Sequence, residues 1–205
     1  MNYIKLIFAF ISIAALGSCG VKTQVSQLEA LQHCVFAVNS IDSVYLAGQP
    51  AEKLVGEGGF NVERAPRLAL AFLQQKVPFK ARLDLDISNP GTEDAGINDF
   101  EYILMIGEYE LLKGVYDRAI LIPAGGGKIN VPFPVNTDIY PVISKPENQR
   151  LLADFFSLSQ DTSVTITLKV KPNIVVADQK VSYPGYIDIK KQLSNREVLR
   201  YLQLQ

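Results

Sequence analysis

The feature that most constrains the fold of this chain is a strict alternation of apolar and polar residues from Val77 to Ser88. Successive side chains of a β-strand point to opposite faces of the sheet, so these twelve residues predict a long strand with one buried face. Asn89-Pro90-Gly91 follows and predicts the end of the strand, because asparagine closes tight turns and proline cannot donate to a strand ladder.

Other stretches of similar alternation predict further strands. They lie at residues 36–46, 100–106, 109–112, 115–122, 129–135, 164–171 and 181–189. Gly107-Glu108 suits a type II′ hairpin turn, and Gly114 predicts a bulge. This mainly β pattern predicts an antiparallel sandwich of about seven strands, fibronectin type III-like or immunoglobulin-like.

Two or three peripheral helices complete the expected fold. Residues 65–75 and 146–157 carry helix formers, and each stretch has a proline that the first helical turn tolerates. Ser194-x-x-Glu197 has the form of a capping box and predicts a C-terminal helix at 195–202.

The N-terminal nineteen residues resemble an export signal that ends in a lipid attachment site. Leu6–Leu16 is an apolar run of eleven residues, whereas a membrane-spanning helix needs about 20, so the run matches the core of a secretory signal. Leu16-Gly17-Ser18-Cys19 resembles the bacterial lipobox, in which the cysteine is acylated and becomes the new N-terminus. The alternative is an ordinary signal peptide with an incidental cysteine.

We therefore expect four parts in the chain. Their bounds are a signal peptide at 1–18, a tether at 19–34, a sandwich at 35–190 and a C-terminal helical part at 191–205. Gly20 after the cysteine resembles the outer-membrane sorting pattern of Gram-negative lipoproteins. The expected location is the periplasmic side of the outer membrane, with the acyl chains as anchor. Cys34 is then the remaining thiol, and burial is its favoured interpretation over intermolecular pairing.

Composition argues against several classes of function. The 20 basic and 21 acidic residues balance, so the chain lacks the basic footprint of a nucleic-acid-binding protein. One histidine and two cysteines offer little for a zinc cluster or a histidine-based relay. Gly125-Gly126-Gly127-Lys128 lacks the spacing of a phosphate-binding loop and predicts a hairpin turn.

The remaining polar candidates have structural alternatives. Asp84 and Asp86 share a strand face, but a solvated polar face explains them as well as a carboxylate pair does. His33 has no serine nucleophile in a recognisable setting nearby. A weak calcium site is conceivable at Asp94, Asp99 and Glu101.

Tyrosines in the predicted strands could line a ligand groove, although packing is their commoner role. They are Tyr102, Tyr109, Tyr116, Tyr183 and Tyr186. From these candidates we expect no catalytic residue, no metal site and no cofactor.

An ordered series of short motifs from Val77 to Val135 resembles the type-2 late embryogenesis abundant family, also known through its water-stress and hypersensitive-response domain. The series consists of Asn89-Pro90, Ala95-Gly96-Ile97, Phe100-Glu101-Tyr102, Gly107, Leu111, Gly114, Ile122-Pro123-Ala124-Gly125-Gly126 and Val131-Pro132-Phe133-Pro134-Val135. The resemblance implies a compact fibronectin type III-like sandwich and an association with desiccation and stress protection. It carries over no catalytic residue.

Together these features predict a non-catalytic envelope lipoprotein that protects against stress or desiccation and is attached to the membrane through Cys19. The alternative is a periplasmic carrier or adaptor that binds a hydrophobic ligand or an envelope protein. No nucleic-acid partner is expected.

Overall fold

A computed structural model describes residues 26–56, 59–60, 65–148, 161–176 and 179–198. The predicted signal peptide at 1–18 and the predicted acylation site Cys19 lie outside these residues, as do residues 149–157 and 199–202 of two predicted helices. None of the described helices is long and apolar enough to cross a membrane.

The described chain is mainly β, as the alternation predicts. Its strands are β1 Val35–Leu46, β2 Gln49–Pro50, β3 Val55–Gly56, β4 Gly59–Phe60, β5 Pro78–Asn89, β6 Ala95–Ile97, β7 Asp99–Ile106, β8 Tyr109–Tyr116, β9 Ile120–Ile122, β10 Gly127–Asp138, β11 Ser163–Val176, β12 Gln179–Ser182 and β13 Ile187–Ser194. The helices are η1 Ala51–Leu54, α3 Pro66–Leu73 and α4 Tyr140–Ile143. Seven of these strands have eight residues or more, which agrees with the predicted number.

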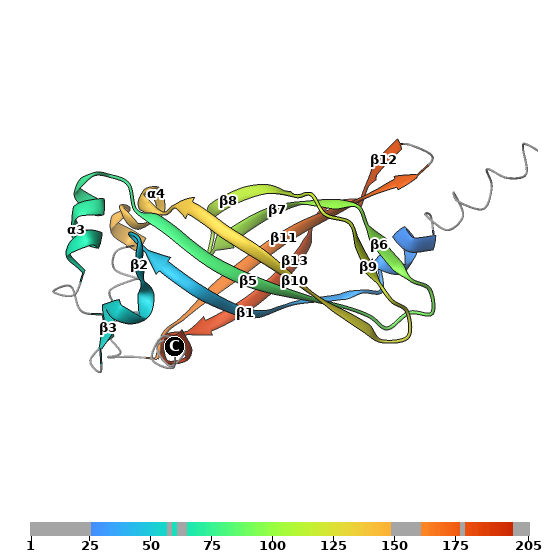
Figure 1. The fold of residues 1–205 in the computed structure, drawn as a ribbon, viewed down its shortest axis with the longest axis horizontal. Coiled ribbons are helices and arrows are strands. Elements are labelled where there is room, and N and C mark those ends of the chain that lie inside the picture. The colour runs from blue at the N-terminus through green and yellow to red at the C-terminus, as the bar shows by residue number, and fades with distance from the viewer. Residues whose placement is uncertain (1–25, 57–58, 61–64, 149–160, 177–178, 199–205) are drawn as a thin grey trace, which may run out of the picture.

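The long strands form two antiparallel sheets that pack face to face (Figure 1). One sheet has the order β10-β5-β1-β2, and the other has the order β12-β11-β7-β8 with β13 also paired to β11. Without the short strands β2 and β12, three strands face four, and this is the arrangement of a fibronectin type III-like sandwich. The fold class predicted from the sequence is confirmed.

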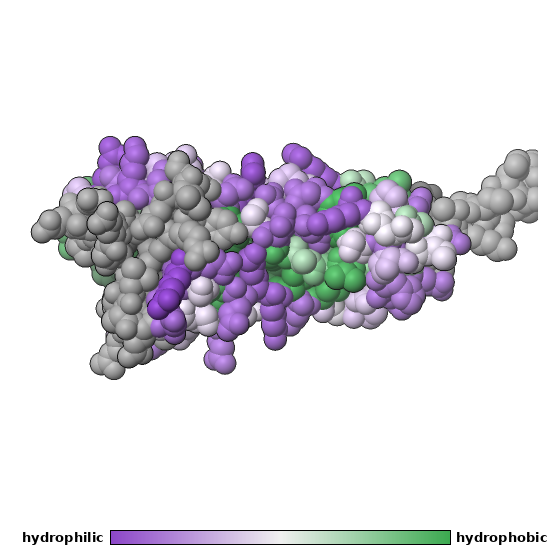
Figure 2. Space-filling model, turned by 90° about the horizontal axis from the view of Figure 1, so that it is seen from below, coloured by the Kyte–Doolittle hydropathy of each residue, from purple (hydrophilic) through white to green (hydrophobic). Residues whose placement is uncertain are grey.

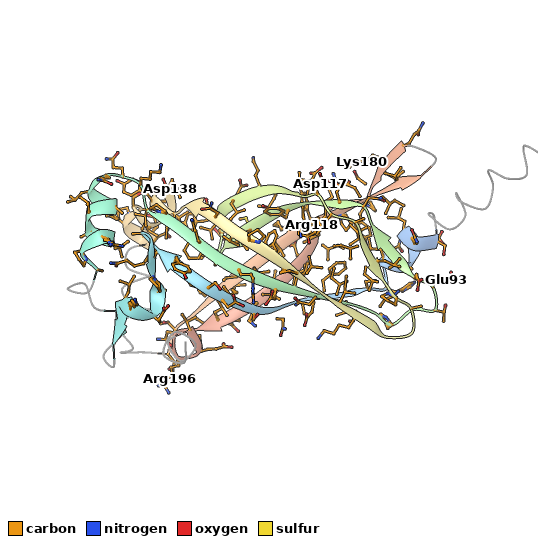
Figure 3. The ribbon with its side chains drawn as sticks, viewed as in Figure 1. Glu93, Asp117, Arg118, Asp138, Lys180 and Arg196 are labelled. Atoms are coloured by element: carbon orange, nitrogen blue, oxygen red, sulfur yellow. The ribbon has the colours of Figure 1, made fainter. Side chains whose placement is uncertain are left out.

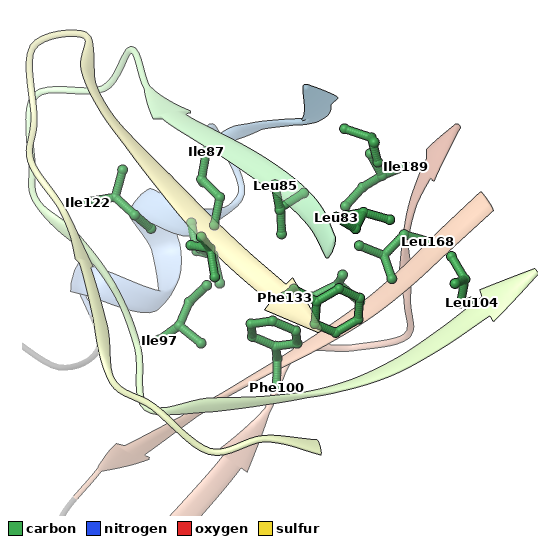
Figure 4. Packing of buried hydrophobic residues seen from close by; sticks show 14 of the residues in the cluster. Leu83, Leu85, Ile87, Ile97, Phe100, Leu104, Ile122, Phe133, Leu168 and Ile189 are labelled. Atoms are coloured by element: carbon green, nitrogen blue, oxygen red, sulfur yellow. The ribbon is translucent and has the colours of Figure 1, made fainter. Parts of the chain in front are cut away.

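Strand β5 is the centre of its sheet and follows the predicted alternation closely. Ala81, Leu83, Leu85 and Ile87 are buried, and β5 pairs along its length with β1 on one side and β10 on the other. The opposing sheet contributes Leu104, Phe100, Leu168 and others to the same core (Figure 4). Because both inner faces are apolar in period two, the sandwich closes on a single cluster of side chains.

The two sides along which the edges of the sheets meet differ in their contacts. On one side, β1 bulges between Val38 and Ser40, and the Lys191 ammonium of β13 donates to the Asn39 carbonyl at 2.7 Å and to the Val38 carbonyl at 3.3 Å. On the other side, β10 pairs only with β5 among the described strands.

The free edge of β10 carries Pro132 and Pro134. Proline has no N–H to donate, and it occurs in sheets on edge strands with its nitrogen turned to the open side. Two prolines at alternate positions therefore remove successive donors and disfavour the pairing of another strand at the middle of this edge.

The bulge predicted at Gly114 is wrong in position. The register of β7 with β8 shifts between Leu104 and Met105, so the extra residue is Leu111. Gly114 has a different role, because a Cβ atom there would lie 2.6 Å from the Tyr102 hydroxyl. The Gly107 turn agrees with the prediction, since its φ of 56° is the positive value that a type II′ turn requires at its first position.

The described part of the predicted tether packs on the domain. Residues 26–31 form a helix whose Leu31 is almost fully buried in the core. The predicted capping box also agrees with the structure, because the Glu197 N–H donates to Ser194 Oγ at 3.1 Å and residues 195–198 are helical. Helix α3 confirms the predicted helix at 65–75.

Figure 1 shows an elongated molecule with two dissimilar ends. We call the end that carries β6, β9, β12 and the helix at 26–31 the exit end, because the described chain begins there. We call the end that carries α3, α4, β2 and β3 the helix end. In Figure 3, Glu93 and Lys180 mark the exit end and Asp138 marks the helix end.

Candidate functional site

The loops of the exit end are fixed by the buried amide of Asn89. Its Nδ2 donates to the carbonyls of Glu93 at 2.8 Å and Ile122 at 3.2 Å, and its Oδ1 accepts from the Gly91 N–H at 3.0 Å. Its own carbonyl accepts from the Gly126 N–H at 2.7 Å. One fully buried side chain thus joins the turn after β5 to the turn before β10.

The second turn needs its glycines and a carboxylate. Gly125 and Gly126 have φ values of 70° and 88°, which glycine adopts without strain. The Ala124 N–H donates to Asp94 Oδ1 at 2.8 Å. The turn leads directly into β10, and Lys128 forms an ion pair with Asp86. The predicted turn is present, and it is followed by strand β10. The predicted hairpin is wrong, because β9 pairs with β6 and β10 pairs with β5, so the two strands that flank the turn belong to different sheets.

A second buried amide, Asn173, fixes hairpin β11–β12 at the same end. Its Nδ2 donates to Asp99 Oδ1 at 2.6 Å, and its Oδ1 accepts from Ser182 Oγ at 2.6 Å. Lys180 Nζ lies 2.9 Å from the same Asp99 oxygen. All four residues of β12 are exposed, so this network holds a hairpin that projects beyond the sandwich.

A polar pocket opens beside these loops. It has a volume of about 300 Å³ and is lined by Ser26, Gln27, Thr92, Glu93 and Asp94. Ser26 Oγ donates to Glu93 Oε2 at 3.2 Å. The pocket is open and acidic, so it has the character of a hydrated surface recess.

The predicted calcium ligands serve separate purposes. Asp94 accepts from the Ala124 N–H, Asp99 bonds Asn173 and Lys180, and Glu101 lies opposite Lys171 in the β7–β11 register. Within the described ranges there is no group of three or more side chains placed to hold a metal ion.

Asp84 and Asp86 lie on the polar outer face of the β10-β5-β1 sheet, as predicted, but Asp86 is buried by its partners and not solvated. Ser40 Oγ donates to Asp84 at 2.9 Å, and Asn130 Nδ2 donates to Asp86 at 2.8 Å. The hydrogen bond from Asn130 and then the interaction with Lys128 hold the pKa of the Asp86 carboxyl below its ordinary value. The charged form of Asp86 is thus stabilised by its own partners.

His33 is exposed in the turn that follows the helix at 26–31. Cys34 is half-buried, and its Sγ lies 3.7 Å from the Ala30 carbonyl. Burial raises the pKa of the Cys34 thiol, which lowers its reactivity at neutral pH. The predicted burial of Cys34 is therefore only partial.

The tyrosines divide between packing and surface roles. Tyr116 stacks on Phe100 at 4.8 Å between ring centroids, and Tyr102 meets the edge of Phe133 at 4.5 Å. Tyr109 lies under the Lys145 ammonium at 4.6 Å, and Tyr186 is exposed. Tyr183 is half-buried against the core. Tyr102 and Tyr116 thus pack on the aromatic rings of the core, whereas Tyr109 and Tyr186 lie at the surface.

The helix end presents apolar surface. On α3, Leu70 is 55% exposed and Leu73 is 81% exposed, while Ala71 is buried. The helix attaches through Phe72, whose ring meets the edge of Tyr140 from α4 at 5.3 Å. This is a surface that can take part in protein contacts.

Two important residues were not predicted from the sequence. Asn173 lies between Lys171-Pro172 and Ile174-Val175-Val176, and nothing in this local pattern indicates a buried amide. Lys191 occupies a polar position of β13, where nothing local indicates that it reaches the bulge of β1.

Comparison with known proteins adds two remote likenesses. A protein from Archaeoglobus fulgidus, known from its crystal structure, has a TM-score of 0.38 and 6% identity, over 77% of this chain and 97% of that one. A protein provisionally described as late embryogenesis abundant (LEA), solved in solution, has a TM-score of 0.35 and 15% identity, over 93% of this chain and 86% of that one. No family model and no curated protein matches the chain. At such values the fold class rests on the sheets described above.

Proposed function

We propose that this chain is a non-catalytic envelope lipoprotein whose type-2 late embryogenesis abundant-like domain protects against stress or desiccation. In this proposal acyl chains on Cys19 attach the protein to the periplasmic side of the outer membrane. The domain acts by contact with its surroundings and uses no cofactor.

The observation that carries the proposal is the place of the family-like motifs in the sandwich. Asn89 locks the turn in which Pro90 lies, and Gly125 and Gly126 form the turn that it holds. Gly114 makes room for Tyr102. The ordered motifs thus serve one purpose, the closure of a fibronectin type III-like sandwich, which is the fold that the resemblance implies.

The outer sheet face supports a protective role in physical terms. Asp86 with Lys128 and Arg82 with Asp42 form ion pairs at 2.8 Å on this face. Charged groups on rigid strands offer hydrogen bonds to neighbouring proteins or headgroups when water is scarce. A sandwich that is already folded also needs no ordering step when it makes such contacts.

Protection is tested by drying a dehydration-sensitive enzyme with the purified full chain and measuring activity after rehydration. The protein should preserve several-fold more activity than the same mass of serum albumin. Recovery equal to that with albumin, for protein shown to be folded, would refute the protective role.

The anchor is tested by mass spectrometry of the protein taken from its own envelope. A diacylglyceryl mass on Cys19 is expected, and Cys19→Ser should move the protein from the membrane to the soluble fraction. An unmodified Cys19 in membrane-bound protein would refute this part.

The exposed leucines of α3 favour a second candidate, an adaptor that docks an envelope protein. Leu70→Glu combined with Leu73→Glu should abolish co-purification of that partner while anchoring stays intact. Unchanged co-purification would remove the adaptor from consideration.

A further inference from the structure

We infer that the exit end is a lipid-contact surface, and that the acylated protein stands on a zwitterionic bilayer with this end down and the helix end directed away. The inference rests on the proposed acylation of Cys19 and adds to it an orientation and a second contact with the membrane.

The first argument is the position from which the chain leaves the domain. Ser26 bonds Glu93, and Gln27 Oε1 lies 2.8 Å from where a Cβ of Gly96 would be, so the helix at 26–31 is fixed against β6. Cys19 precedes Ser26 by seven residues, and seven extended residues reach at most about 25 Å.

That reach is shorter than the sandwich. Strand β5 runs from the helix end to the exit end with twelve residues, which corresponds to about 40 Å at 3.3 Å per residue. An upright domain on such a short tether therefore presents the exit end to the lipid and keeps α3 beyond the headgroups.

The second argument is the exposed apolar side chains on elements of the exit end. Val35 begins β1 and is 57% exposed, Leu121 of β9 is 55% exposed, and Val181 lies on the projecting strand β12. Tyr186, which follows β12, is also exposed. Figure 2 shows that the broader apolar area of this face lies on the flank of the domain, between its middle and the exit end, so the exit end carries its apolar side chains singly. Valine and leucine favour the acyl boundary, and tyrosine favours the headgroup level.

The third argument concerns the kind of lipid. Glu29, Glu93 and Asp94 are exposed at the exit end, and they would be repelled by anionic headgroups. Lys180, the cation on β12, is already paired with Asp99. The contact therefore fits a zwitterionic surface better than an anionic one.

The test is hydroxyl-radical footprinting of the acylated protein on vesicles of phosphatidylethanolamine and phosphatidylcholine. Labelling of Leu121, Val181 and Tyr186 should fall several-fold on vesicle binding, while labelling of Leu70 and Leu73 stays unchanged. Equal labelling of the exit end with and without vesicles, or protection of α3 in its place, would overturn the inference.

Two variants separate docking from anchoring. Leu121→Glu with Val181→Glu alters only exposed side chains, so the acylated protein should stay on the vesicles but lose the protection of Tyr186. Leu70→Glu with Leu73→Glu is the matched control, and in this variant Tyr186 should remain protected from labelling on the vesicles. Retained protection in the first variant would overturn the inference.

A last arm separates this inference from the proposed function. If native Cys19 proves unmodified, the Cys34→Ala protein can be coupled at Cys19 to a maleimide lipid and footprinted in the same way. Protection of the exit end would then support the docking surface although natural acylation had failed. Absence of protection in the coupled protein would overturn the docking surface itself.

Discussion

The two ends of this sandwich are built by different means. At the exit end, the fully buried amides of Asn89 and Asn173 each satisfy several backbone and side-chain groups and hold the loops against one another. At the helix end, the Asp138 carboxylate accepts from the Val77 and Tyr140 N–H groups. There, within the described ranges, the buried Asn148 amide donates only to the Val142 carbonyl of α4, and α3 meets α4 through an aromatic contact.

The difference teaches where rigidity and exposed surface arise. At the exit end, hydrogen bonds of buried amides hold the loops in place. The apolar side chains of these loops and strands can therefore stay exposed without loosening the backbone that carries them. A short helix attached by one aromatic ring buries only part of its apolar side chains, and Leu70 and Leu73 remain in contact with solvent. We expect the exit end to open last and the helix end first.

The largest effect is expected from Asn89→Ala. It removes three hydrogen bonds and leaves buried backbone groups without partners, which should lower the free energy of unfolding by about 3 kcal/mol. Urea unfolding measures this loss. Thr92→Ala, an exposed change in the same loop, is the control and should behave like the wild type. A loss of unfolding free energy no larger than that of the Thr92→Ala control would show that the Asn89 hydrogen bonds do not hold the loop.

A smaller and local effect is expected from Asp138→Ala at the helix end. Two backbone N–H groups lose their acceptor, at a cost of about 1–2 kcal/mol. Hydrogen exchange should accelerate in α3 and α4 and stay slow in β6 and β9. Faster exchange at both ends would contradict the independence of the two regions.

Protonation of Asp86, which lies in the sheet between the two ends, should lower the free energy of unfolding in acid. Its pKa is lowered in the folded state, so its contribution to stability is present at neutral pH and is lost as pH falls from about 4 through the folded value. The free energy of unfolding of the wild type should exceed that of Asp86→Asn near neutral pH, and the two should converge in acid. A difference that does not change with pH would contradict this assignment.

The smallest effect is expected from Leu73→Gln. The side chain is 81% exposed, so the free energy of unfolding should change by less than about 0.5 kcal/mol. Phe72→Ala on the same helix is the contrasting variant and should destabilise, because its ring contacts Tyr140. Marked destabilisation by Leu73→Gln would show that the Leu73 side chain is buried in solution by another part of the protein.

The parts of the fold that were predictable from sequence are those governed by local chemistry. Period two placed Leu83, Leu85 and Ile87 in the core, and the capping pattern placed Ser194 at a helix start. The turn at Asn89 followed from the conformational preferences of asparagine and proline.

What escaped prediction depends on residues that are distant along the chain. Asn173 acts through Asp99, which lies 74 positions earlier, and Lys191 acts on a carbonyl 152 positions away. The misplaced bulge has the same origin, since the Tyr102 ring across the strand pair explains Gly114 and the register places the extra residue at Leu111. Such pairings depend on strand register, which no local pattern specifies.

The prolines on the free edge of β10 have a consequence for a crowded or drying compartment. As water leaves, protein concentrations rise, and exposed strand edges become templates for sheet growth from one molecule to the next. Pro132 and Pro134 remove two successive outward donors from the middle of this edge, where such growth would need them. The sandwich can therefore be concentrated against its neighbours without adding a strand to itself along β10.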